Sequence, residues 1–203
     1  ILERPDSVKE RFEFGHWECD LVIGNRSDDN ALLTMVERKT RKSKIYRLPS
    51  KSSSYVMDVF HALKDKFGKN FSKVFKSITT DNGSEFSNPK ALESDRQGNH
   101  RTKVFYCDAS APHQKGSAER NHEFIRMFIP KGTPMDDFSQ DDISVMMNHI
   151  NSYGRSSLGD KSPYEVMEFL YGPEILKLLG CTRISPDDVT LSPSVFKKEG
   201  EQK

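Results

Sequence analysis

Residues 15–24 read GHWECDLVIG, and from Trp17 onward apolar and polar side chains alternate as in a β-strand. One face of the expected strand carries Trp17, Cys19, Leu21 and Ile23, and the other carries Glu18, Asp20 and Val22. A carboxylate in the middle of an otherwise apolar strand is a candidate functional group. In a sheet covered on one face only, the same side chain can simply point to water.

The residues after this strand predict a meander. Ala31–Glu37 and Lys44–Leu48 are two further strand candidates. The connections 25–30 and 38–41 are short and polar, as hairpin turns are. Three consecutive antiparallel strands are therefore expected.

A helix and a fourth strand are expected next. Ser53 or Ser54 can cap a helix whose apolar residues recur at helical spacing and which ends near Gly68. Val74–Thr79 is rich in β-forming residues and leads into residues 81–83, Asp-Asn-Gly, a turn signal at the end of a strand.

The second half of the chain predicts one more strand and several helices. Residues 88–102 are expected to form a polar loop before a short strand, Lys103–Tyr106. A helix is predicted over Ser117–Phe128, and further helices begin after the N-cap residues Ser139 and Ser162. Together these elements describe an α/β domain with a mixed sheet flanked by helices.

Composition excludes several classes of protein. With 203 residues and 34% hydrophobic content, the chain can bury one core. It has no run of about 18 apolar residues, which favours a cytoplasmic protein without a membrane span. Cys19, Cys107 and Cys181 are far apart and odd in number, so neither a disulfide framework nor a zinc site is indicated.

The charge is unevenly distributed. The net charge of +1 does not by itself indicate a polyanion partner. Between Arg38 and Lys51, however, there are seven basic residues and no acidic one. Such a tract can follow a phosphate backbone, and it can equally be a solvated hairpin with basic side chains.

Three carboxylates lie where they could converge. Asp20 is inside a strand, Asp81 is at a strand end, and Glu119 is near the start of a helix. Phosphoryl transfer by metal ions needs carboxylates from different elements that together hold hard cations. An exposed strand residue, a common turn and a helix-starting acid explain the same positions without catalysis.

Six segments, in order, resemble the motifs of the insertion-sequence-30 family of bacterial transposases. They are residues 15–24 (GHWECDLVIG), 33–41 (LTMVERKTR), 80–86 (TDNGSEF), 116–121 (GSAERN), 128–133 (FIPKGT) and 161–166 (KSPYEV). The ordered set, from about Arg4 to Met167, is more specific than any single motif. The chain departs from the family pattern at Cys19, where the family often has Gly, and at residues 93–101, which look like extra sequence.

The resemblance implies a ribonuclease-H-like fold with a mixed five-stranded sheet, and Mg²⁺ or Mn²⁺ as cofactor. It implies cleavage and joining of double-stranded DNA at the inverted-repeat ends of a mobile element, with Asp20, Asp81 and Glu119 as catalytic metal ligands. We expect a homo-oligomer in the active complex. We expect a catalytic core domain at 1–185 and a poorly ordered tail at 186–203. The family's upstream helix-turn-helix region has no counterpart in this chain.

Basic residues near these motifs are candidate DNA contacts, and each is also an ordinary surface charge. The candidates are Lys115, Arg126, Lys131, Arg38, Lys39, Arg41 and Lys42.

Two other functions fit the same sequence. One is a metal-dependent nuclease of the same fold, which cuts DNA but does not join it. The other is a non-catalytic DNA-binding module derived from a transposase. The three retained carboxylates argue against the second, because a module without catalysis has no chemical need for them.

Overall fold

The computed structural model describes residues 4–25, 29–108 and 111–196, so residues 26–28 of the first predicted turn and residues 197–203 of the predicted tail lie outside the described residues. The strands are β1 (His16–Ile23), β2 (Ala31–Glu37), β3 (Ser43–Leu48), β4 (Ser77–Thr80) and β5 (Lys103–Tyr106). The helices are α1 (Asp6–Lys9), α2 (Ser53–Phe67), α3 (Phe71–Val74), α4 (Pro89–Glu93), α5 (Gly116–Phe128), α6 (Gln140–Ser152), α7 (Pro163–Tyr171) and α8 (Pro173–Leu178).

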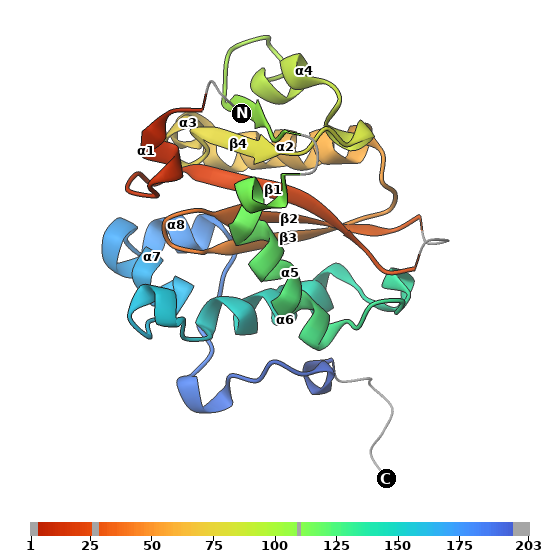
Figure 1. Cartoon of the computed structure of the whole chain (residues 1–203), viewed down its shortest axis with the longest axis vertical. Helices are drawn as coiled ribbons and strands as arrows, with labels where there is room; N and C mark the ends of the chain where they lie inside the picture. The colour runs from red at the N-terminus through yellow and green to blue at the C-terminus, as the bar shows by residue number, and fades with distance from the viewer. Residues whose placement is uncertain (1–3, 26–28, 109–110, 197–203) are drawn as a thin grey trace.

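The five strands form one mixed sheet in the order β3-β2-β1-β4-β5 (Figure 1). The pairs β1–β2 and β2–β3 are antiparallel, as the meander predicts, whereas β4 pairs in parallel with both β1 and β5. The central strand is therefore β1, and its neighbour β4 points the same way. The prediction of a mixed five-stranded sheet flanked by helices is confirmed.

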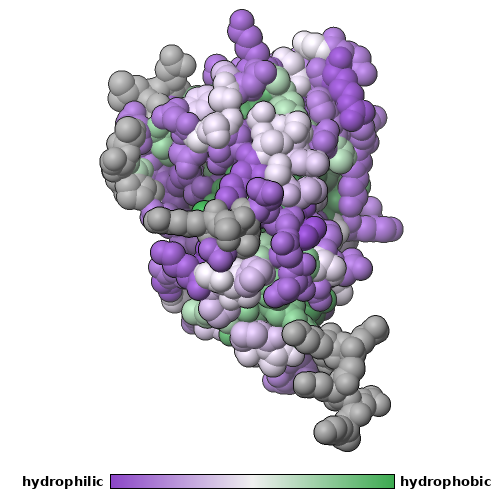
Figure 2. All heavy atoms as spheres, turned by 90° about the vertical axis from the view of Figure 1, so that its right-hand side faces the viewer, coloured by the Kyte–Doolittle hydropathy of each residue, from purple (hydrophilic) through white to green (hydrophobic). Residues whose placement is uncertain are grey.

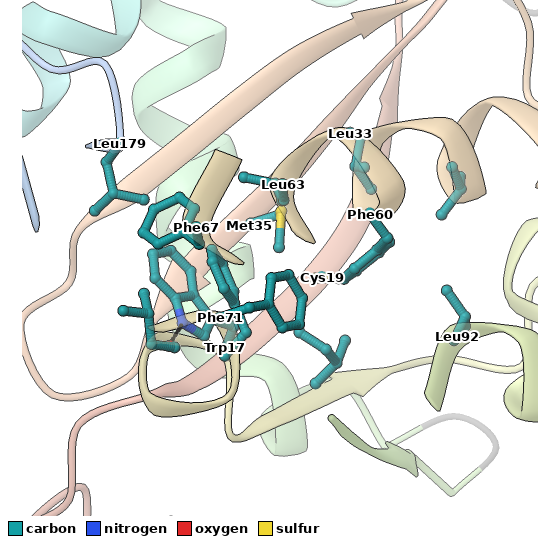
Figure 3. Close-up of a cluster of buried hydrophobic side chains, with 14 of the residues drawn as sticks. Trp17, Cys19, Leu33, Met35, Phe60, Leu63, Phe67, Phe71, Leu92 and Leu179 are labelled. Carbon is teal, nitrogen blue, oxygen red and sulfur yellow. Dashed lines mark hydrogen bonds between the residues drawn. The ribbon is translucent and has the colours of Figure 1, made fainter. Parts of the chain in front are cut away.

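The alternation along β1 divides the interior into two apolar clusters. Trp17 and Cys19 point into the larger cluster, formed with α2, α3, α4, α7 and α8 (Figure 3). Val22 points into the second cluster, formed with α5 and α6. Burying each large apolar side chain contributes about 1.5–3 kcal/mol to the stability of the fold. Helices therefore pack firmly against both faces of the sheet. Glu18 and Asp20 consequently face the side of the sheet on which α5 lies.

The helix ends follow the predicted signals. Helix α2 ends at Gly68, whose φ of 53° is a left-handed value that glycine adopts without a Cβ penalty. Ser139 and Ser162 both form capping boxes, with Asp142 and Glu165 as the reciprocal partners.

Two predicted segments differ from the structure. The strand expected at Val74–Thr79 begins only at Ser77, because Val74 closes the short helix α3, where its carbonyl accepts the indole N–H of Trp17 at 2.7 Å. The polar loop expected at 88–102 contains α4, which Asn88 caps and which buries Leu92 in the core. One buried leucine in a polar segment is too weak a periodic signal to predict a helix.

The described part of the predicted tail, residues 186–196, lies against the second cluster. The Phe196 ring is 4.8 Å from that of Phe138 and 6.2 Å from that of Phe128, centroid to centroid. The surface on the right-hand side of Figure 1 is mostly hydrophilic (Figure 2). Among the described residues, no helix is long and apolar enough to cross a membrane.

Candidate active site

Asp20 and Asp81 are brought together by the parallel pairing of β1 with β4. His16, Trp17 and Glu18 pair with Ser77, Ile78 and Thr79. The same register, continued by two residues, places Asp20 opposite Asp81, just beyond the end of β4. Because neighbouring strands are about 4.8 Å apart, two residues separated by 61 positions in the chain become neighbours.

The Lys115 ammonium joins these two carboxylates. Its Nζ donates to Asp20 Oδ2 at 2.8 Å and to Asp81 Oδ2 at 2.9 Å. Burial of Lys115 opposes its charge, but attraction to Asp20 and the hydrogen bonds to Asp20 and Asp81 outweigh this and raise its pKa. One positive charge thus compensates two negative charges that would otherwise repel each other.

Helix α5 lies across this site and presents one stripe of polar residues to β1 and β2. Lys115, just before the helix, reaches Asp20. His122 Nε2 is 3.1 Å from the Thr34 hydroxyl, which donates to the Asp20 carbonyl, and Arg126 donates to the Ile23 carbonyl at 2.6 Å. Burial lowers the pKa of His122, while the nearby Asp20 opposes this shift.

Glu119 lies within this stripe, one turn after Lys115 and one turn before His122, since residues three or four apart share a helix face. Its side chain is exposed. Within residues 4–25, 29–108 and 111–196, no group of three His, Cys, Asp or Glu residues is close enough to hold a metal ion. The structure therefore brings Asp20 and Asp81 together. Glu119 lies on the face of α5 that carries His122, but it does not join the two aspartates.

Glu18, two residues before Asp20 on the same face of β1, holds the start of α5. Its fully buried carboxylate accepts the backbone N–H of Ala118 at 2.8 Å and pairs with the Arg38 guanidinium. Arg38 Nε also donates to the Val8 carbonyl at 2.9 Å. The residue before Glu119 is thereby tied to the strand that carries Asp20. The alternation along residues 17–23 predicted this face for Glu18 but indicated no role for it.

The candidate DNA contacts are in different environments. Arg38 and Lys42 are buried, and their donors are used inside the protein, Arg38 by Glu18 and Lys42 by the Cys181 sulfur at 2.6 Å. Lys39 is half-buried and Lys131 is exposed. Arg41 donates to Ser117 Oγ at 2.9 Å, next to the start of α5. Part of the basic tract is thus buried inside the protein. Composition alone did not distinguish its buried residues from its accessible ones.

The mixed five-stranded sheet with its flanking helices has a ribonuclease-H-like fold, the fold of integrase catalytic cores. The chain superimposes on the catalytic core domain of BIV integrase with a TM-score of 0.53 and 17% identity, covering 75% of this chain and 92% of that one. It superimposes on a chain of the simian T-cell lymphotropic virus intasome with a TM-score of 0.55 and 15% identity, covering 86% and 57%.

The chain is a homologue of the insertion-sequence-30 and other insertion-sequence transposases. It is 34% identical over 168 residues to transposase InsI of insertion sequence element IS30A from Escherichia coli K12, a match that covers 83% of this chain and 42% of that protein. It is 31% identical over 169 residues to the probable transposase of element IS1161 from Streptococcus salivarius, covering 83% and 46%. No family model matches. The chain spans less than half the length of these relatives.

Proposed function

We propose that this chain is the catalytic domain of a transposase that cleaves DNA and transfers strands at the inverted-repeat ends of an insertion sequence. The observation that carries the proposal is the convergence of Asp20 and Asp81 on one cationic group. Similarity to transposases over most of the chain supports it. We propose that the catalytic core spans residues 1–185 and acts on double-stranded DNA. We further propose that it works in the cytoplasm and that its active form is a homo-oligomer.

The two aspartates fit a hard divalent cation. Mg²⁺ and Mn²⁺ prefer carboxylate oxygens, and Asp20 Oδ2 and Asp81 Oδ2 already share one positively charged neighbour. Asp20, Asp81 and Glu119 would hold the metal, with Lys115 competing for the same two oxygens. The chemistry supplied by metal in the proposed two-metal mechanism is activation of the attacking oxygen and stabilisation of the leaving oxygen.

The chain's own residues prepare the site. Lys115 keeps the carboxylates close without metal, because its charge offsets their repulsion. His122 and Thr34 fix the backbone of β1 at Asp20. Glu18 fixes the first turn of α5 and so the position from which Glu119 projects. No side chain has to attack phosphorus, since water or a DNA 3′-hydroxyl is the nucleophile.

The proposal is tested against the nuclease alternative by strand joining. An active protein that carries this chain is given a precleaved element end with a free 3′-hydroxyl, a target duplex and Mn²⁺. We expect a joined product of increased length on a denaturing gel. Cleavage of the target without joining identifies a nuclease. Neither product, although the protein binds DNA, identifies a non-catalytic module.

Metal binding is expected to raise thermal stability. At a metal concentration ten times its Kd, binding to the folded state alone adds about 1.4 kcal/mol. For a domain of this size that is roughly 3–6 °C in Tm. Asp20→Asn should remove most of the increase, because it removes one of the two converging carboxylates, while leaving the metal-free protein folded.

Calorimetry or dye-based melting with and without Mg²⁺ measures this effect. Asp58→Asn is the matched control, since Asp58 is exposed on α2, on the other side of the sheet. It should keep the full metal-induced shift. Equal shifts in the parent protein and in Asp20→Asn would exclude Asp20 as a metal ligand.

A further inference from the structure

A cavity of about 530 Å³ opens beside the first turns of α5, on a face next to the one that carries Glu119. Its walls come from segments far apart in the sequence: the turn after α1, the end of β2 and the β2–β3 turn, α5, and the loop between α6 and α7. Its lining residues with cationic, amide or aromatic side chains include Arg11, Arg41, Arg120, Asn121, Tyr153 and Arg155. This volume is in the range of small-ligand sites.

The cavity is strongly cationic. Four of its wall residues are arginines, and Asp160 is the acidic residue among the described residues that line it. No ion pair joins Asp160 to these arginines in the described part of the chain. Burial, together with repulsion from neighbouring arginines, lowers the pKa of both Arg41 and Arg155 to about 10. Folding therefore holds like charges together, and an anion between them would relieve the repulsion.

Two buried donors in the cavity wall lack acceptors. Arg155 Nε and Asn121 Nδ2 have no hydrogen-bond partner among the described residues. Asn121 is only 4% exposed, and its carbonyl oxygen accepts from Ser43, which leaves its amide group for another partner. Both atoms lie beneath the cavity surface, so a ligand in the cavity meets the guanidinium groups of its wall and not these two donors. Phosphate oxygens match the charge and the N–H donors of those guanidinium groups.

An aromatic ring completes the cavity. Tyr153 is 41% exposed, and its ring centroid is 5.7 Å from that of Phe124. The Arg155 guanidinium stacks on Phe124 at 3.5 Å from the ring centroid. An exposed ring beside an arginine cluster is the arrangement that binds an unpaired base by stacking while the phosphate contacts the cations.

We propose that this cavity binds one unstacked nucleotide of a DNA strand, with its phosphate among Arg41, Arg120 and Arg155 and its base against Tyr153. The inference rests on the proposed function in taking DNA as the ligand. Arg120 immediately follows Glu119, and a helix with its side chains is about 10 Å across. A strand whose scissile phosphate lies at Asp20 and Asp81 can therefore reach the cavity within a few nucleotides.

The test measures DNA binding in EDTA, so that it does not depend on catalysis. Fluorescence anisotropy of a short labelled single strand is recorded over a range of salt concentrations for Arg41→Gln, Arg120→Gln and the parent protein. Arg96→Gln is the matched control, because Arg96 is exposed and pairs with Asp65 away from the cavity. Each cavity variant should bind about tenfold more weakly and lose about 0.7 from the salt slope, as expected for one phosphate contact. Arg96→Gln should stay within about twofold of the parent.

Tyr153 separates a nucleotide site from a simple anion site. Tyr153→Leu should weaken single-strand binding by about tenfold, and Tyr153→Phe should preserve it, because the ring and not the hydroxyl stacks. Unlabelled strand should displace the label at lower nucleotide concentration than deoxyadenosine monophosphate, and both should outcompete inorganic pyrophosphate. Stronger displacement by the free mononucleotide would identify a soluble nucleotide as the ligand and overturn the proposal.

Two further results would also overturn it. One is unchanged affinity and salt slope in both arginine variants. The other is pyrophosphate competing as well as DNA while Tyr153→Leu has no effect, which would identify an inorganic anion site. Failure of strand joining with intact nucleotide binding would instead count against the proposed catalytic function and leave the cavity assignment standing.

Discussion

Glu119→Gln is expected to reduce DNA cleavage and joining at least about a hundredfold, whereas Glu123→Gln should keep most of the activity. The reason is that, under the proposed function, only the first variant loses a metal ligand. The measurement is the amount of cleaved and joined product on a denaturing gel, with an active protein that carries this chain. Circular dichroism establishes that both variants are folded. The reverse ranking would assign the third carboxylate to Glu123.

The structure gives a physical reason for this ranking. Glu119 shares its helix face with Lys115 and His122, which contact Asp20 and Thr34. Glu123 is exposed and pairs with the Arg120 side chain. Glu123 is also about 6 Å further along the helix axis, at 1.5 Å per residue. The two glutamates, four residues apart, share one helix face. They differ in their distance from the start of α5, where Lys115 contacts both aspartates, and in the ion pair that occupies Glu123.

Local sequence patterns predicted much of the fold. The alternation in β1 depends only on side chains two residues apart, and it correctly separated Trp17 from Asp20. The capping boxes at Ser139 and Ser162 involve residues three apart, and both are present. Such signals are readable from the chain because each is complete within one turn or one strand.

Contacts between distant residues were not predictable in the same way. Lys115 was a candidate DNA contact from its loop position, whereas its ammonium lies between two aspartates from other elements. The cavity arginines come from four separate segments, so no local sequence motif predicts that they lie together. His122 contacts Thr34, which is 88 residues away in the sequence.

Arg38 shows most clearly how a tertiary contact changes the interpretation of a charge. In the sequence it belongs to a basic tract, which suggested contact with DNA. In the structure it is 4% exposed and pairs with Glu18, whose side chain is fully buried. A buried ion pair is not necessarily stabilising in itself, because both charges lose water. Removing one partner is different, since the remaining charge is then buried without compensation.

Arg38→Met is therefore expected to destabilise the protein by about 3–5 kcal/mol, because the Glu18 carboxylate stays buried without its counter-charge. The expected fall in Tm is roughly 10 °C, measured by thermal melting at neutral pH. Lys39→Met, at the neighbouring half-buried position, should change stability by no more than about 0.5 kcal/mol. Adding Glu18→Gln to Arg38→Met should restore most of the loss, since glutamine carries no charge and its oxygen can still accept the Ala118 N–H. A double variant as unstable as Arg38→Met would mean that packing of the arginine, and not the unpaired carboxylate, accounts for the effect.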